Sequence, residues 1–134
     1  MYYPSENEFV KLASGYNIIP VYREMPCGEM SPVSVFEKVK GDYSYLLESV
    51  EGEKKIARFS FVGCDPSLIF KSKEDRIDIT KDGKSQVCHT SSPLNEIKRI
   101  MKKFRPASIK GLPRFWGGLV GYMGYDVVRF FERL

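Results

Sequence analysis

Apolar residues recur at helical spacing in three stretches of the chain, and the first two open with residues that favour a helix start. Residues 5–14 begin with Ser5 and place Glu8 three positions later, which is the spacing of a capping box. Residues 32–40 begin with Pro32 at the first helical position, and Ser31 precedes it as the N-cap residue. In residues 94–105 apolar side chains share one face and basic side chains the other. The pattern predicts three amphipathic helices.

Apolar and polar residues alternate through the middle of the chain, as they do in strands. Residues 43–50 and 55–63 are joined by a short loop that contains a glycine, and they predict an antiparallel hairpin. Another strand is expected from residue 67. Residues 75–89 predict a second, more polar hairpin around an Asp-Gly turn.

Two other segments are rich in β-forming residues but contain features that restrict pairing. Residues 18–24 include Pro20, which confines them to a sheet edge or a strand start. Residues 115–126 contain four glycines among large aromatic and aliphatic side chains. A strand so rich in glycine lets another backbone or a ligand approach closely, so tight sheet packing is expected. A phosphate-binding loop is the alternative, but the usual Gly-Lys-Ser/Thr ending is missing.

These elements predict an α+β fold, mostly antiparallel sheet with flanking helices. With 134 residues, 43% of them hydrophobic, the chain has the size and apolar content of one domain, expected over residues 1–134. Its longest apolar runs are far shorter than the ~20 residues that cross a bilayer, so no membrane partner is expected. The first residues lack the basic start and apolar stretch of a secretory signal. A cytoplasmic location is the resulting expectation.

The net charge of +4 is concentrated in one place. Residues 94–105 contain five basic residues and one acidic residue. The net charge of this segment is therefore +4, which equals the net charge of the whole chain. This helix is expected to start near Ser92, whose hydroxyl could cap it ahead of Pro93, and to stop before Pro106. A stand-alone basic module that binds nucleic acid is therefore an alternative, but no stacking aromatics or recognition motif accompany the charge. A solvated helix face is favoured, and no nucleic-acid partner is expected.

The residues that usually carry catalysis are scattered. Cys27, Cys64 and Cys88 are too far apart for a zinc site or a disulfide framework and are interpreted as reduced structural thiols. The single histidine, His89, lies in a polar stretch and is expected at the surface. Because no nucleophile with a base, carboxylate pair or metal cluster is assembled, the chain is expected to contain no catalytic residue and no metal ligand.

The first hairpin places two serines among apolar strand positions. Period-two alternation puts Ser49 on the face of Leu47, with Glu48 on the opposite face, and it separates Ser60 from Phe59. A serine hydroxyl and backbone groups at a strand edge can anchor the ammonium and carboxylate of an amino acid, while apolar neighbours hold its side chain. The alternative is an ordinary hairpin whose serines bond to the backbone.

Several motifs resemble the N-terminal region of anthranilate synthase component I and occur in that family's order. They are Ile19-Pro-Val-Tyr-Arg-Glu, Ser31-Pro-Val-Ser-Val-Phe, Leu46-Leu-Glu-Ser, Ala57-Arg-Phe-Ser-Phe-Val-Gly-Cys-Asp-Pro and Phe115-Trp-Gly-Gly-Leu-Val-Gly-Tyr-Met-Gly-Tyr-Asp. The glycine-rich block also occurs in para-aminobenzoate synthase component I of the folate pathway, which is the alternative family. The Leu-Leu-Glu-Ser element favours the anthranilate enzyme.

The resemblance implies a parent subunit that converts chorismate and ammonia to anthranilate and pyruvate with Mg²⁺. It also implies a glutamine amidotransferase partner that supplies the ammonia and feedback inhibition by L-tryptophan. The catalytic and magnesium residues of the family lie in a C-terminal chorismate-binding region, so a tryptophan-sensing N-terminal domain that stops before that region is expected. Carried over from the family's motifs, the tryptophan contacts implied here are Ser49 with its neighbours Leu47 and Glu48, and Arg58, Phe59 and Ser60 on the next strand.

Overall fold

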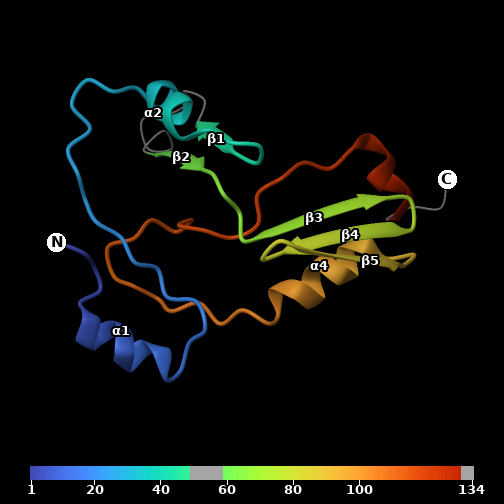
Figure 1. Ribbon diagram of the computed structural model, residues 1–134, viewed down its shortest axis with the longest axis horizontal. Coiled ribbons are helices and arrows are strands. Elements are labelled where there is room, and N and C mark those ends of the chain that lie inside the picture. Colours follow the sequence, from blue (N-terminus) through green and yellow to red (C-terminus); the bar gives the residue numbers. More distant parts are fainter. Residues whose placement is uncertain (49–58, 131–134) are drawn as a thin grey trace. The chain divides into compact units, whose positions relative to one another are not determined.

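The computed structural model describes residues 1–48 and 59–130 of the chain. These residues contain helices and two antiparallel sheets, of two and three strands, which confirms the predicted α+β class (Figure 1). The chain divides into two compact units, one formed by Met1–Pro26 with Thr90–Leu134 and the other by Cys27–His89. That both units belong to one domain over residues 1–134 stays a prediction.

The two N-terminal helices form where local capping favours them. Helix α1 (Glu6–Ala13) begins after Ser5, whose backbone N–H and hydroxyl both donate to Oε2 of Glu8, at 3.0 and 2.7 Å. Helix α2 (Pro32–Val39) has its proline in the first turn, and the Ser31 hydroxyl accepts a hydrogen bond of 3.1 Å from the backbone N–H three residues later. Both predicted helices are confirmed.

The first hairpin is present as a short strand pair. Strands β1 (Tyr45–Glu48) and β2 (Ser60–Gly63) are antiparallel, and helix α2 contacts both of them. A Cβ atom on Gly63 would overlap the ring of Tyr45, its direct partner in the register, so the tyrosine ring covers the glycine. The segment that joins the two strands lies outside the described residues.

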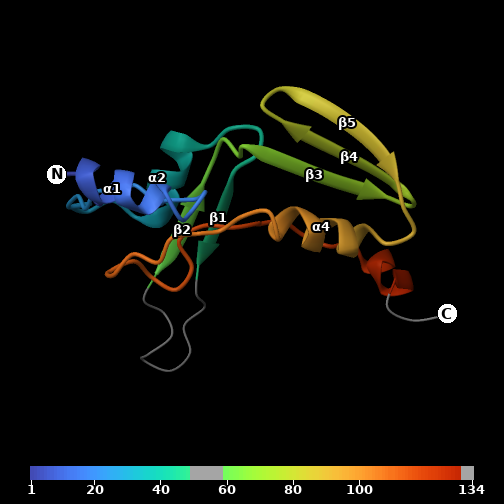
Figure 2. The ribbon, with the colours of Figure 1, turned by 90° about the horizontal axis from the view of Figure 1, so that it is seen from below.

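The second hairpin belongs to a three-stranded sheet that is drawn in light green to yellow in Figure 2. Strands β3 (Leu68–Lys73), β4 (Arg76–Lys81) and β5 (Lys84–His89) pair in chain order. A two-residue loop joins β4 to β5, and Asp82 and Gly83 both have positive φ, 51° and 73°. Two positive φ values are those of the tight hairpin turn that Asp-Gly favours, so the prediction from this dipeptide is confirmed.

Among the described residues few apolar side chains are buried. Ile77, at the centre of the three-stranded sheet, is completely buried. In the other unit, Ile100 and Ala107 are the buried apolar residues among those that the structure describes. Many large apolar side chains are exposed, and Tyr122 is 97% exposed. Burial is the main source of folding free energy, so these surfaces are available for further packing.

The basic helix starts where it was predicted, but it lacks the expected cap and ends early. Helix α4 (Pro93–Met101) does start at the proline, but the Ser92 side chain makes no capping hydrogen bond, because its backbone (φ −135°, ψ 67°) leaves the extended conformation of an ordinary N-cap. At the other end, i→i+3 bonds from the N–H groups of Lys103 and Phe104 tighten the chain, so the helix stops well before Pro106.

Two segments that were expected to form strands do not form them. Residues 18–24 take part in single bridges, Ile18 with Pro106 and Tyr3 with Tyr22. Residues 117–124 are neither helix nor strand, and the 3-10 helix η1 (Tyr125–Phe130) follows them. The expected tight sheet packing of the glycine-rich block is therefore not observed in the described part of the chain, because a strand requires a hydrogen-bonded neighbour and no described segment provides one.

Candidate functional site

The predicted amino-acid site falls on the ends of β1 and β2. Leu47 and Glu48 are the last two residues of β1, Ser60 is the first residue of β2, and Phe59 immediately precedes it. The register pairs Glu48 with Ser60, so these four residues meet at one end of the strand pair. The other two predicted contacts, Ser49 and Arg58, lie outside the described residues.

The strand register divides the four residues between two faces. Directly paired residues of an antiparallel ladder project to the same face, so Glu48 and Ser60 share one face. Leu47 pairs with Phe61 on the other face, and the rings of Phe59 and Phe61 lie 6.1 Å apart between centroids. The polar groups and the apolar groups therefore lie on opposite sides of the ribbon. A ligand that uses both must sit at the strand ends.

All four side chains are accessible to a ligand. Leu47 is 44% exposed and Phe59 is 52% exposed, and Glu48 and Ser60 are exposed as well. A carboxylate accepts hydrogen bonds from an ammonium group, a hydroxyl donates to a carboxylate, and the leucine and phenylalanine side chains offer apolar contact. The arrangement can bind an amphoteric molecule with an apolar part, but it contains no pair of groups for chemical catalysis.

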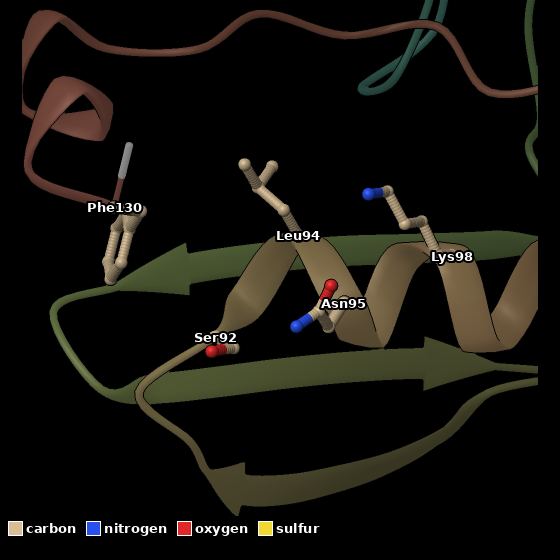
Figure 3. Close-up of a pocket in the computed structure, with 5 residues that line it drawn as sticks. All are labelled: Ser92, Leu94, Asn95, Lys98 and Phe130. Atoms are coloured by element: carbon tan, nitrogen blue, oxygen red, sulfur yellow. The ribbon is translucent and has the colours of Figure 1, made fainter. Parts of the chain in front are cut away.

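A separate hollow of about 190 Å³ lies at the start of α4 (Figure 3). Its lining combines polar and apolar side chains, namely Ser92, Leu94, Asn95, Lys98 and Phe130. Its volume is below the ~300 Å³ at which pockets for drug-sized ligands begin, so it can hold only a small group. None of the residues predicted as tryptophan contacts lines it. The sequence pattern gave no signal for this hollow, because Phe130 comes from η1, a separate element far along the chain from α4.

The single histidine and the three cysteines are exposed. His89 is exposed, as predicted, and its Nδ1 lies 3.0 Å from Oδ2 of Asp75. The three cysteines are free, as predicted, but they are exposed rather than packed in a core. Among the residues that the structure describes, no three histidine, cysteine or acidic side chains gather as metal ligands.

The basic segment has the amphipathic form that its pattern predicted. Ile100 is buried on the apolar side, whereas Lys98, Lys102 and Lys103 are exposed. Arg99 forms an ion pair with Glu96, and hydrogen bonding from this arginine lowers the pKa of the glutamate below its ordinary value.

None of the helices in residues 1–48 and 59–130 has the length and apolar character that a bilayer span requires.

Comparison with curated proteins shows similarity along nearly the whole chain. The sequence is 44% identical over 130 residues to anthranilate synthase component 1 of Aquifex aeolicus, which covers 96% of this chain and 26% of the relative. It is 42% identical over 135 residues to the protein of the same name from Acetivibrio thermocellus, covering 100% of this chain and 27% of the relative. The Synechocystis protein of that name is 36% identical over 132 residues, with 96% and 26% coverage.

The chain thus spans about a quarter of the length of these relatives. No family model matches the sequence. No solved structure matches it either.

Proposed function

Since the chain is similar over nearly its full length to a segment of the anthranilate synthase component 1 family, we propose that it is the amino-terminal, tryptophan-sensing part of such a subunit. The similarity confirms the resemblance based on the sequence motifs, and the relatives named above carry the anthranilate rather than the para-aminobenzoate name. Extended identity, rather than any single motif, carries the proposal.

The complete subunit in this proposal forms anthranilate and pyruvate from chorismate and ammonia, for tryptophan biosynthesis. A glutamine amidotransferase subunit provides the ammonia. Mg²⁺ belongs to the chorismate-binding region in this proposal, as the resemblance to the family implies. The contribution proposed for this chain is binding and regulation.

The regulatory site in this proposal is the end of the β1–β2 ribbon. Support comes from the register, which brings Glu48 and Ser60 together on one face with Leu47 and Phe59 on the other. L-Tryptophan has an ammonium group, a carboxylate and an apolar ring, which match a carboxylate, a hydroxyl and an apolar surface. Ser49 and Arg58 complete the proposed contacts.

Inhibition follows from linkage in this scheme. Tryptophan binds to one arrangement of the subunit more tightly than to the catalytically active arrangement, and so it lowers the active population. The expected coupling free energy is in the common range of about 1–3 kcal/mol. Binding across two parts of the subunit makes the affinity of this chain for tryptophan weak when it is tested alone.

The test joins this chain to the part of the Aquifex aeolicus relative outside the matched residues and measures anthranilate formation from chorismate and ammonia by fluorescence. Ser49→Ala is expected to raise the tryptophan concentration for half-inhibition at least about tenfold, because a lost hydrogen bond to a charged group costs about 1.5–3 kcal/mol. Turnover without tryptophan stays near the parent value.

The matched control is Ser72→Ala, which removes an exposed hydroxyl from β3 and should leave inhibition unchanged. Direct tryptophan binding to the joined protein, measured by calorimetry, separates loss of binding from loss of coupling. Unchanged inhibition and binding in Ser49→Ala would remove the proposed role of this serine. Para-aminobenzoate as the product would replace the anthranilate assignment with the folate-pathway alternative.

A further inference from the structure

The glycine-rich segment (residues 117–124) has a backbone without partners in the described part of the chain. It forms no helix or strand, and no backbone hydrogen bond joins residues 117–123 to another described segment. Its large side chains face solvent: Tyr122 is 97% exposed and Met123 is 63% exposed. Backbone polar groups and apolar side chains in such a segment are both free to pair with another polypeptide.

Three of the four glycines in this segment have no explanation among the residues that the structure describes. A Cβ atom at Gly117, Gly121 or Gly124 would meet no described atom within 4 Å. None of these three residues has the positive φ that would require glycine. Gly118, with φ 144°, is the exception. Glycine costs conformational entropy on folding, so it is expected where another group must approach the backbone closely. At these positions that group is not among the described residues.

The β1–β2 ribbon contains an example of a group that approaches a glycine closely. There Gly63 is covered by the ring of Tyr45 on the neighbouring strand, and a side chain on the glycine would collide with that ring. Aromatic side chains commonly cover glycines in this way in antiparallel sheets. The same packing over Gly121 requires a neighbouring strand that carries large apolar side chains.

We propose that the glycine-rich segment is a strand-pairing surface whose partner is a strand, rich in large apolar side chains, from the component 1 polypeptide that this chain does not include. This inference rests on the proposed function. The relatives contain about three quarters of their length outside the matched region. Leu119, Val120 and Tyr122 are residue types that favour strands, and an added strand would satisfy the backbone groups and cover the exposed side chains.

The experiment mixes this chain with the separately produced remainder of the Aquifex aeolicus relative and follows amide hydrogen exchange by mass spectrometry. Association is expected, and the amides of residues 117–124 are expected to exchange at least about tenfold more slowly in the complex than in the free chain, as hydrogen-bonded strand amides do. The free chain is measured at several concentrations in parallel.

Two glycine variants give the specific test. Gly121→Val is expected to weaken association at least about tenfold by blocking the close approach of the partner. Gly15→Val is the matched control, because a Cβ atom there also meets nothing within 4 Å, and it should associate normally. Circular dichroism of both free variants should match that of the parent chain.

Several results would overturn the inference. They are absence of association, association with unchanged exchange in residues 117–124, and normal association of Gly121→Val. Protection that grows with the concentration of the free chain would assign the surface to a second copy and would also overturn it. The tryptophan experiment on the covalently joined protein reports on the proposed function separately, so failure of one proposal is distinguishable from failure of the other.

Discussion

The two antiparallel sheets of this chain differ at their most buried position. In the three-stranded sheet, β4 has a neighbour on each side and its Ile77 is fully buried. In the two-stranded ribbon, four-residue strands leave Leu47 and Phe59 about half exposed. A two-stranded ribbon is marginally stable without support, which α2 provides here through its contacts with both strands. The three-stranded sheet thus provides a fully buried packing centre at Ile77, whereas the ends of the ribbon strands have side chains available for binding.

Removing the buried side chain of the three-stranded sheet should have the largest effect. Ile77→Ala is expected to lower the free energy of unfolding by about 2–5 kcal/mol, because it removes fully buried methyl groups and leaves a cavity. The measurement is urea denaturation followed by circular dichroism. Val87→Ala in β5 is the control, since this valine is 52% exposed and its loss should cost well under half as much. Equal losses for the two variants would show that β4 is not the packed centre.

A methyl group on the ribbon glycine should have an intermediate effect. Gly63→Ala is expected to destabilise the ribbon by about 1–3 kcal/mol, the usual cost of overpacking, because the added Cβ atom collides with the Tyr45 ring. Faster hydrogen exchange of the β1 and β2 amides is the readout.

Two further variants isolate the cause of that effect. In a Tyr45→Ser background, Gly63→Ala should destabilise the ribbon much less, because the clashing ring is absent. A double-mutant cycle should therefore show coupling between the two positions. Gly117→Ala, which adds a methyl group in open space, should leave exchange in the ribbon unchanged. A cycle without coupling would contradict the proposed covering of Gly63 by the tyrosine ring.

The smallest expected effect concerns an exposed ion pair on the three-stranded sheet. Hydrogen bonding from Arg76, whose Nη2 lies 2.7 Å from Oδ1 of Asp78, lowers the pKa of the aspartate carboxyl. Arg76→Gln should therefore raise that pKa toward its ordinary value of about 3.9, as measured by an NMR titration of the carboxyl carbon. Lys84→Gln, which removes a more distant charge from β5, is the control and should leave it lowered.

The sign of the linked stability follows from the direction of this pKa. Because the pKa of Asp78 is lower in the folded chain, the pair stabilises the fold above the ordinary carboxyl pKa, and this contribution is lost as the pH falls through the folded value. Both side chains are exposed, so the contribution is small. Stability curves of the parent and Arg76→Gln should converge at low pH. A difference that grows as the pH falls would contradict the assignment.

Local interactions account for the elements that were predicted correctly. The Ser5 and Glu8 capping pair starts α1, and the Asp82-Gly83 turn closes the β4–β5 hairpin. Both depend on atoms within a few residues of one another, so the sequence pattern was sufficient. Prediction was wrong at Ser92, where the residue type suits a cap but the backbone angles do not. It was also wrong for the glycine-rich segment, whose residues favour a strand but have no neighbour among the described residues.

For the candidate site too, the sequence pattern predicted local features but not the pairing between segments. Alternation along each strand predicted that Leu47 and Glu48 face opposite ways, as do Phe59 and Ser60, and the strand pairing agrees with this. The pattern within one strand could not show whether Glu48 lies on the same face as Ser60 or as Phe59. That depends on the register between the strands, and a shift of one residue exchanges the faces.

The amino-acid sequence by itself determined the helix starts, the tight turn, the alternation of the strands and the similarity to anthranilate synthase component 1, since all of these depend on residues close together in the chain or on direct comparison of sequence. The tertiary structure alone decided that Glu48 pairs with Ser60, that Ile77 is buried and that the glycine-rich segment has no partner in the described chain. These features depend on which distant segments meet, and that outcome is set by packing and hydrogen bonding between segments rather than by local preference.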